Sequence, residues 1–310
     1  MTQAISEILH LFEQNTAMFS TFMFLMGACI GSFLNVVIIR LPNILFWQWK
    51  IQCNEILESP EKTDPAAAIS NSATLDSDTE SPPPGLMFPR SRCPKCNSGL
   101  TLMQNIPVLG YLILGGRCGF CKKSISPRYL IVELFTAMIW MHLGLHFGPT
   151  PELLFSLILV SSLITLTMID LDHHILPDVI VLPLLWIGLI SNSSNIFTSL
   201  ESAVFGAIAG YLILWIIYQI HHRLTGKEGM GYGDFKLLAC LGAWLGWEVL
   251  PAVILLASVS GTILAIILMV VRKRGKDIPV AFGPYLSIAG WITLVWGDTI
   301  IHNHLQIFQI

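Results

Sequence analysis

Charge is scarce in this sequence of 310 residues. Only 12% of the residues are Asp, Glu, Lys or Arg, whereas 54% are apolar. A soluble domain of this length cannot bury so much apolar surface, so we expect an integral membrane protein whose main partner is the lipid bilayer. The net charge is −3, and no basic patch interleaved with aromatic residues indicates a nucleic-acid partner.

Apolar stretches long enough to cross a bilayer need about 20 residues. Six clear stretches and two weaker ones occur, and they predict an all-α polytopic protein with about eight transmembrane helices. The clear ones lie near 18–39, 129–147, 151–169, 179–193, 202–220 and 250–271, and the weaker ones near 235–249 and 284–301. No Lys or Arg precedes the first stretch, so we expect a retained helix and not a cleaved signal peptide.

Lys and Arg are absent from every second loop between these stretches. The loops HFGPTPE, SNSSNIFTSLE and GWEVLP and the tail from His302 contain none, and all 17 basic residues fall in the remaining segments. Basic loops stay on the cytoplasmic side of a membrane. The pattern therefore predicts a membrane protein with both termini outside and its basic loops in the cytoplasm.

One sizeable polar segment, 42–128, separates the first two stretches, and its halves differ. Residues 57–85 are rich in Ser, Pro, Asp and Glu, and a segment with so few large apolar residues is expected to stay unfolded. We therefore divide the chain into an N-terminal segment with the first helix (1–41), a cytoplasmic domain (42–128) and a membrane-embedded domain (129–310).

The second half of this segment contains two C-x-x-C pairs. Cys93 and Cys96 are separated by 21 residues from Cys118 and Cys121. Four soft thiolates favour tetrahedral zinc, with iron as the alternative metal, in a small zinc-ribbon-like domain. Two disulfides or a thioredoxin-like pair are the other interpretations, but a cytoplasmic location and the lack of a βαβ pattern argue against both. Four thiolates leave no open position, so the metal is expected to be structural.

Acidic residues inside or beside membrane helices are costly and usually functional. Asp170, Asp172 and Asp178 lie at the inner end of the third stretch, and Asp234 lies at the inner start of the sixth. Two close carboxylates share one proton, as in aspartic proteases. Asp170 and Asp172 point to different faces of a helix, so only one of them should meet Asp234, and the spacing does not say which.

Other interpretations of these residues remain open. Asp234 could simply cap its helix, and transporters also place carboxylates near the interface. The loop GKEGMGYG could suggest a nucleotide or S-adenosylmethionine site, but no strand precedes it and no Walker pattern follows. Its glycines would let an extended peptide approach closely. Zinc and serine protease patterns are missing, since H-E-x-x-H does not occur and Ser260 has no evident base.

Several motifs in one order resemble those of the type IV prepilin peptidases, membrane aspartic proteases of the GxGD group. The match covers nearly the whole chain, and Ala281, where the family usually has Pro, is a departure outside the catalytic motifs. The motifs are GSFLNVVIIRLP, SRCPKC, NIPVLGYL, GGRCGFC, ISPRYLIVEL, IDLDHHILPD, GMGYGDFKLLACLGAWLG and AFGPYLSIAGW.

The resemblance implies a bifunctional enzyme of the bacterial inner membrane. It would cleave the short basic leader of type IV prepilins and export pseudopilins after a glycine, with Asp170 and Asp234 as the catalytic pair. Gly231, Tyr232 and Gly233 would form the active-site loop. The second implied activity is methylation of the new N-terminal residue from S-adenosylmethionine.

The residues themselves reveal no methyl-donor site, and Gly116 and Arg117 are candidates by resemblance alone. Glu133 is a further charge near the start of the second stretch, and a simple interpretation pairs it with Arg128. Two rival functions remain: a transporter or channel with Asp170 and Asp234 as an ion relay, and a non-enzymatic assembly factor held together by zinc.

Overall fold

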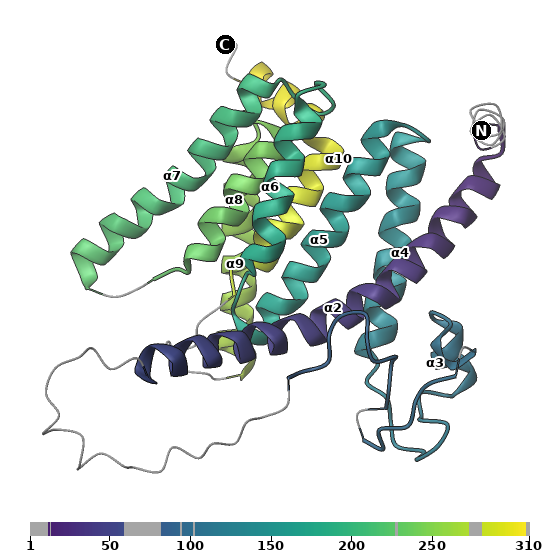
Figure 1. Cartoon of the computed structure of the whole chain (residues 1–310). Coiled ribbons are helices and arrows are strands. Elements are labelled where there is room, and N and C mark those ends of the chain that lie inside the picture. Colours follow the sequence, from purple (N-terminus) through teal and green to yellow (C-terminus); the bar gives the residue numbers. More distant parts are fainter. Residues whose placement is uncertain are drawn as a thin grey trace, which may run out of the picture.

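The computed structural model describes residues 12, 14–58, 82–93, 95–101, 103–226, 229–272 and 281–307, and within these ranges the chain is almost entirely helical. Two isolated β-bridges are the only extended pairings in this part of the chain. The helices are α2 (Thr16–Glu58), η1 (Met103–Asn105), α3 (Leu109–Ile113), α4 (Arg128–Phe147), α5 (Pro151–His173), α6 (Asp178–Asn192), α7 (Leu200–Thr225), α8 (Tyr232–Leu245), α9 (Leu250–Arg272) and α10 (Gly283–Ile307). Figure 1 shows the long helices side by side.

Each of the eight predicted stretches coincides largely with one helix of the described chain, although the stretch 235–249 runs past the end of α8 at Leu245. Five of these helices are long and apolar enough to cross a membrane: α2, α4, α5, α7 and α9. The helix α6 (Asp178–Asn192) is apolar but shorter. The predicted all-α membrane fold is therefore confirmed, while the count of eight spans stays a prediction. Most of the predicted unfolded insert, residues 59–81, lies outside the described residues.

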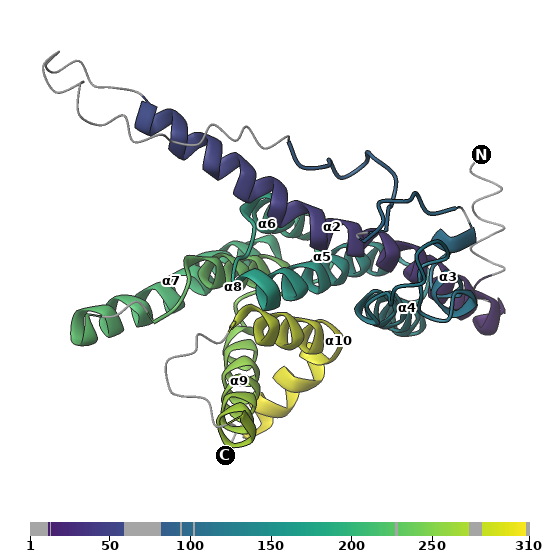
Figure 2. The same ribbon diagram turned by 90° about the horizontal axis from the view of Figure 1, so that it is seen from below.

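The helix α2 is much longer than its predicted span. Its 43 residues correspond to roughly 65 Å at 1.5 Å per residue, about twice the thickness of a hydrocarbon core. Pro42 lies inside it, where proline removes one hydrogen bond to the preceding turn and bends a helix. Figure 1 shows that α2 bends near its middle and then runs past the lower ends of the other helices, and Figure 2 shows it crossing them in the view from below. The predicted boundary at residue 42 thus falls within a helix, and the division into domains stays a prediction.

Small residues bring α2 against α4. Gly27 and Gly31 are four residues apart on α2, and a Cβ on them would lie 2.8 Å from the Cα atoms of Ala137 and Glu133, respectively. Such small-xxx-small pairs let helix backbones pack closely in membranes. Asn35, one turn further along, donates from Nδ2 to the Tyr129 carbonyl at 3.0 Å. This contact fixes the start of α4 beside the middle of α2.

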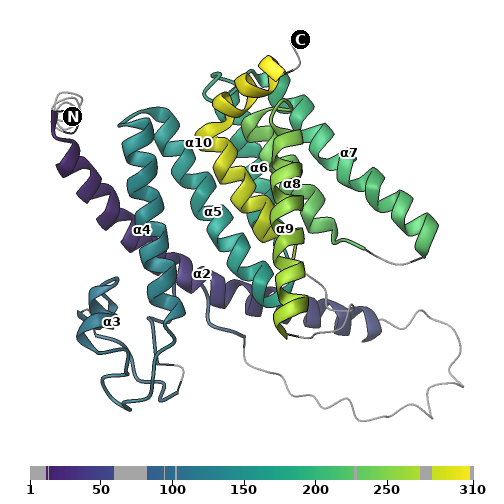
Figure 3. The same cartoon turned by 180° about the vertical axis from the view of Figure 1, so that it is seen from behind.

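The core of the bundle is α8, whose residues from Asp234 to Trp244 are almost all buried. Its backbone approaches α7 so closely that a Cβ on Gly242 would lie 2.2 Å from the Gly206 carbonyl oxygen. Buried Asn192 of α6 donates to the carbonyls of Ala243 and Trp244, each at 2.9 Å. Figure 3 shows α8 with α6, α7, α9 and α10 around it. These contacts fix the C-terminal half of α8 against α6 and α7.

The two ends of the bundle differ in charge. Arg128 begins α4, Arg223 lies in the last turn of α7, Lys236 in the first turns of α8, and Arg272 ends α9. These helix ends lie on one side of the bundle together with residues 82–127, whereas the start of α2 and the end of α10 lie on the other (Figure 1). The loops at that other end, 148–150, 193–199 and 246–249, contain no Lys or Arg.

Candidate active site and metal centre

The two C-x-x-C pairs form two turns of the same design. Cys93 N–H donates to the Ser98 carbonyl and Cys118 N–H to the Lys123 carbonyl, both at 2.9 Å. One isolated β-bridge joins the residues flanking each turn, Arg92 with Gly99 and Arg117 with Ser124. Each turn presents its two thiols to the other turn.

The four sulfur atoms of these cysteines fit a tetrahedral metal site. All lie within 4.8 Å of one another, and Sγ atoms of Cys93 and Cys121, and of Cys96 and Cys118, are 3.9 Å apart. A tetrahedron with Zn–S bonds of about 2.3 Å has edges of about 3.8 Å. Hydrogen bonds with the Ser98 hydroxyl and backbone lower the pKa of the Cys96 thiol to about 6, and backbone hydrogen bonds at Cys121 and Phe120 lower that of Cys118. Thiolates are the metal-binding form, so the geometry and the chemistry of the set suit zinc.

Asp170 and Asp234 lie together at the same end of the bundle. Asp170 belongs to the last turn of α5 and is 5% exposed, and Asp234 belongs to the first turn of α8 and is 8% exposed. The two carboxylates are close enough to act on each other electrostatically. The Gly283 N–H, at the start of α10, donates to Asp170 Oδ2 at 3.0 Å. Three helices thus converge on a buried pair of carboxylates.

Leu176 fills the space between these helix ends. A Cβ on Gly233 would lie 2.9 Å from Leu176 Cβ, and one on Gly283 would lie 3.2 Å from Leu176 Cδ2 and 2.6 Å from Asp170 Oδ2. Glycine at both positions therefore lets the carboxylates approach. His174 ends α5 in the left-handed conformation, with its N–H bonded to the Asp170 carbonyl at 2.9 Å.

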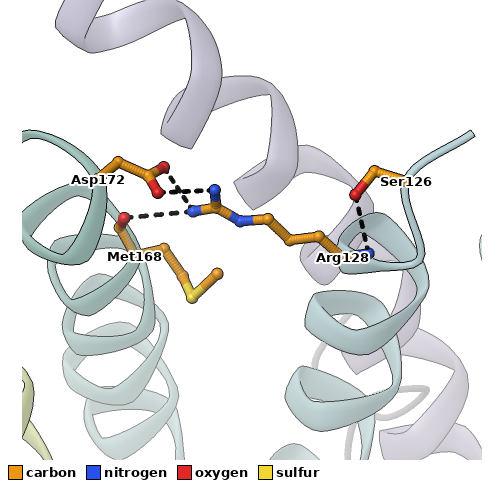
Figure 4. Close-up of polar contacts among 4 residues, drawn as sticks. All are labelled: Ser126, Arg128, Met168 and Asp172. Carbon is orange, nitrogen blue, oxygen red and sulfur yellow. Dashed lines mark hydrogen bonds and ion pairs between the residues drawn. The ribbon is translucent and has the colours of Figure 1, made fainter. Parts of the chain in front are cut away.

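Asp172 and Asp178 are held elsewhere by cations. Arg128 contacts Asp172 Oδ1 at 2.8 Å and Oδ2 at 2.6 Å (Figure 4), and Lys236 Nζ contacts the two oxygens of Asp178 at 2.8 and 2.7 Å. Neither carboxylate shares the position of Asp170. The position of Arg128 thus distinguishes Asp172, which is bound to a cation, from Asp170, which is buried. The simple pairing of Glu133 with Arg128 is wrong, because Arg128 binds Asp172 and the Glu133 carboxylate accepts from the Val108 N–H at 2.7 Å.

The glycine loop leads directly into the first turn of α8, which carries Asp234. Gly231 is the N-cap residue of α8, in an extended conformation with φ −78° and ψ 145°, and Asp234 is the third residue inside the helix. Its N–H donates to the Gly231 carbonyl at 3.2 Å. Tyr232 is 53% exposed and its ring packs against Tyr218 and Phe235. Asp234 thus lies at a helix N-terminus, where a negative charge is favoured.

A cavity of about 660 Å³ lies between α2, the start of α4 and the cysteine turns. Asn35, Tyr111, Tyr129 and Glu133 contribute to its wall, as do Cys93 and Cys118. Gly116 and Arg117 are not among the described residues that line it, although a Cβ on Gly116 would lie 2.9 Å from the Tyr111 hydroxyl in that wall. No motif marks the cavity, because its walls come from segments far apart in the chain.

These features define a class of protein: an all-helical membrane protein with a buried carboxylate pair and a four-cysteine centre. Residues 25–147 match the bacterial peptidase A24 N-terminal domain, and residues 157–266 match the type IV leader peptidase family. The chain is 47% identical to a prepilin leader peptidase/N-methyltransferase from Stutzerimonas stutzeri, over 92% of this chain and 93% of the relative.

Relatives with the same printed name occur in Pseudomonas aeruginosa, with 46% identity over 91% of this chain and 92% of the relative, and in Aeromonas hydrophila, with 47% identity over 94% and 95%. No solved structure matches the chain. The chain belongs to the type IV leader peptidase family. The predicted family, and with it the predicted class of enzyme, is confirmed.

Proposed function

We propose that this chain cleaves the leader of type IV prepilins and pseudopilins with Asp170 and Asp234, and then methylates the new N-terminal residue. One observation carries the assignment of the catalytic pair. Asp170 and Asp234 are the buried carboxylates that meet at one end of the bundle, while Asp172 and Asp178 are each bound to a cation. The names of the curated relatives support both reactions.

Cleavage follows from two carboxyl groups that hold one proton between them. The ionised carboxylate takes a proton from a water molecule as its oxygen attacks the scissile carbonyl carbon. The protonated carboxyl donates a hydrogen bond to the carbonyl oxygen. When the peptide bond breaks, the proton taken from water passes to the leaving amine. The Gly283 N–H holds Asp170 Oδ2, which leaves the other oxygen of Asp170 for this chemistry.

The loop around Gly231, Tyr232 and Gly233 is suited to an extended leader segment. Gly231 is itself extended, and only Asp234 Oδ2, at 3.9 Å, lies near the position of an added Cβ. A peptide backbone could therefore approach the loop beside Asp234. The described Lys and Arg residues at this end support an active site that faces the cytoplasm of a bacterial inner membrane, with both termini outside.

The proposal also includes a structural zinc ion bound by the four cysteines. The residues that hold it are Cys93, Cys96, Cys118 and Cys121, and with four thiolate ligands zinc stabilises the fold of the surrounding segment. S-adenosylmethionine supplies a transferable methyl group when bound. Cleavage at Asp170 and Asp234 frees the new N-terminal amine. This amine must reach the methyl group in its unprotonated form, with its lone pair available.

The test is cleavage of a purified prepilin by this protein in detergent. Asp170→Asn and Asp234→Asn keep the side-chain size, and loss of the general base or acid should slow cleavage about 100- to 10,000-fold. Asp172→Asn and Asp178→Asn are the matched controls at ion-paired positions. Parental cleavage by either Asp170→Asn or Asp234→Asn, in folded protein, would remove that residue from the mechanism.

The same variants separate the rival functions. An ion relay predicts transport that is lost in Asp170→Asn and no cleavage by the parent protein. An assembly factor held together by zinc predicts that both Asp→Asn variants still support pilus assembly in cells, while the Cys→Ser variants fail. Cleavage by the parent and its loss in both variants would exclude each of these.

A further inference from the structure

The cavity beside the cysteine turns has the size of a small-molecule site. Its volume of about 660 Å³ lies within the range of roughly 300–1,000 Å³ usual for bound ligands. Three separate parts of the chain form it: the middle of α2, the first turns of α4, and residues 91–127. Most of its exposed surface is apolar, with a few polar groups converging on it. These are the features of a binding site, and the cleavage mechanism does not use them.

Glu133 is the polar group of this cavity with the strongest requirement for a partner. It is 9% exposed on α4, and among the described residues it forms no ion pair. Its Oε2 accepts from the Val108 N–H at 2.7 Å. Val108 has φ 61°, which is rare and strained for a β-branched residue. A buried carboxylate is costly unless a cation or several donors compensate it, so Glu133 is suited to contact a positively charged group of a ligand.

The rest of the wall adds the complementary features. Tyr111 and Tyr129 provide aromatic surface, and positive charge comes from four side chains of the wall, Arg40, Arg92, Lys95 and Lys123. Glu133 is the only acidic side chain among the described residues of the wall. A ligand that carries a cationic centre, a flat heteroaromatic ring and a carboxylate would therefore find a partner for each part. A sulfonium methyl donor with a nucleoside and an amino-acid end has this composition.

We propose that this cavity is the methyl-donor site, with Glu133 facing the positively charged sulfonium and amino groups of S-adenosylmethionine. The proposal rests on the methyltransferase activity proposed above, and it adds the location of the donor. In the transfer, the lone pair of the substrate amine forms the new N–C bond, the C–S bond breaks with its electron pair left on sulfur, and the extra proton on nitrogen passes to solvent.

The location also suits the order of the two reactions. Pro127 and Tyr129 belong to the cavity wall, and Arg128 between them reaches across to Asp172, two residues after Asp170 (Figure 4). Both centres lie at the same end of the bundle. Cleavage at Asp170 would therefore release the new amine beside the end of α5, which the Arg128–Asp172 contact links to the cavity wall.

The first experiment measures donor binding to the full-length protein in detergent by calorimetry. Glu133→Gln keeps an acceptor for the Val108 N–H but removes the charge, and it should weaken the affinity for S-adenosylmethionine at least about tenfold. Glu201→Gln, the same change at an exposed position on α7, is the control and should bind as the parent does. Equal affinities of parent and Glu133→Gln would overturn the proposal.

The second experiment needs no variant and guards against a folding defect. Radiolabelled S-adenosylmethionine is photo-crosslinked to the parent protein, and the labelled peptide is identified by mass spectrometry. We expect label within residues 91–133 or 32–40, and label confined to the glycine loop 229–234 would overturn the proposal. If the parent cleaves prepilin but binds no donor, the methyltransferase function fails together with this site. If it methylates but carries its label elsewhere, only the site assignment fails.

Discussion

Arg128 binds Asp172 through both carboxylate oxygens, at 2.8 Å from Nη1 to Oδ1 and 2.6 Å from Nη2 to Oδ2. The pair joins the first residue of α4 to the last turn of α5. Arg128 also donates to the Met168 carbonyl at 3.3 Å. This bidentate contact fixes the helix end that carries Asp170 relative to the segment that carries the cysteines.

The Arg128–Asp172 pair should contribute to stability more than to cleavage. Both side chains are about one-third exposed, so we expect a coupling of about 0.2–1 kcal/mol in a double-mutant cycle of Arg128→Gln and Asp172→Asn. The measurement is thermal unfolding in detergent. Cleavage by Asp172→Asn should stay within about threefold of the parent, the factor that corresponds to about 0.65 kcal/mol. Loss comparable to that of Asp170→Asn would assign Asp172 a part in the chemistry.

Gly283→Ala should abolish most cleavage. The added Cβ would lie 2.6 Å from Asp170 Oδ2, so either the carboxylate or the start of α10 must move, and a displacement of about 1 Å in a catalytic group can cost about 100-fold in rate. Gly297→Ala on the same helix is the control, because its Cβ would have its nearest neighbour, Val249 Cγ1, at 3.6 Å. Initial cleavage rates of the two variants decide the matter, and similar rates would show that Asp170 is not held by Gly283 in the way described.

Removal of the metal should affect methylation more than cleavage. Cys93 and Cys118 take part in both the cysteine cluster and the cavity wall, whereas Asp170 and Asp234 lie on α5 and α8. We expect about one zinc ion per chain, its loss in Cys93→Ser, and a lower ratio of methylation to cleavage. Elemental analysis and the two activity assays check this. Cys29→Ser, which lies outside the cluster, should retain the metal, and a Cys93→Ser protein with full metal content would contradict the site.

Gly242→Ala should destabilise the bundle. A Cβ there would lie 2.2 Å from the Gly206 carbonyl oxygen, and neither backbone can yield without separating α7 from α8. Overpacking of this kind costs about 1–3 kcal/mol or more. The midpoint of thermal unfolding in detergent should fall well below that of Gly297→Ala. Equal midpoints would mean that α7 and α8 do not pack as closely as described.

Much of the fold was predictable from the sequence because apolar runs and helices coincide in a membrane protein. The apolar stretch near 151–169 and the helix Pro151–His173 begin at the same residue. The first helix extends beyond its predicted apolar stretch, 18–39, since Pro42 indicates the end of a helix when read alone, although the residues directly after it are mostly apolar. In the structure α2 continues to Glu58, because a proline bend leaves the following turns free to remain helical.

The sites were predictable to the extent that their residues are neighbours in sequence. The two C-x-x-C pairs predicted that the four cysteines lie together, as they do in the structure, and the acidic clusters offered a few aspartates as candidates for a catalytic pair. To distinguish Asp170 from Asp172 required the position of Arg128, which lies 44 residues before Asp172 in the sequence. The contact between Glu133 and the Val108 N–H, and the cavity around it, depend on how α2, α4 and the cysteine turns meet. No local sequence pattern predicts these contacts between distant segments.

Because α2 continues through Pro42, one helix contacts both the cavity and the end of α5 that carries Asp170. Asn35 of α2 lines the cavity, and Phe46, one turn beyond Pro42, packs its ring 5.6 Å from that of His173 at the end of α5. A chain divided at residue 42 would be cut through a helix and not through a linker. A fragment that starts at residue 129 would keep both aspartates but lose the helix that braces α4 and α5. Engineering a stand-alone protease from this enzyme would therefore have to retain α2, and with it a wall of the cavity that we propose for the methyl donor.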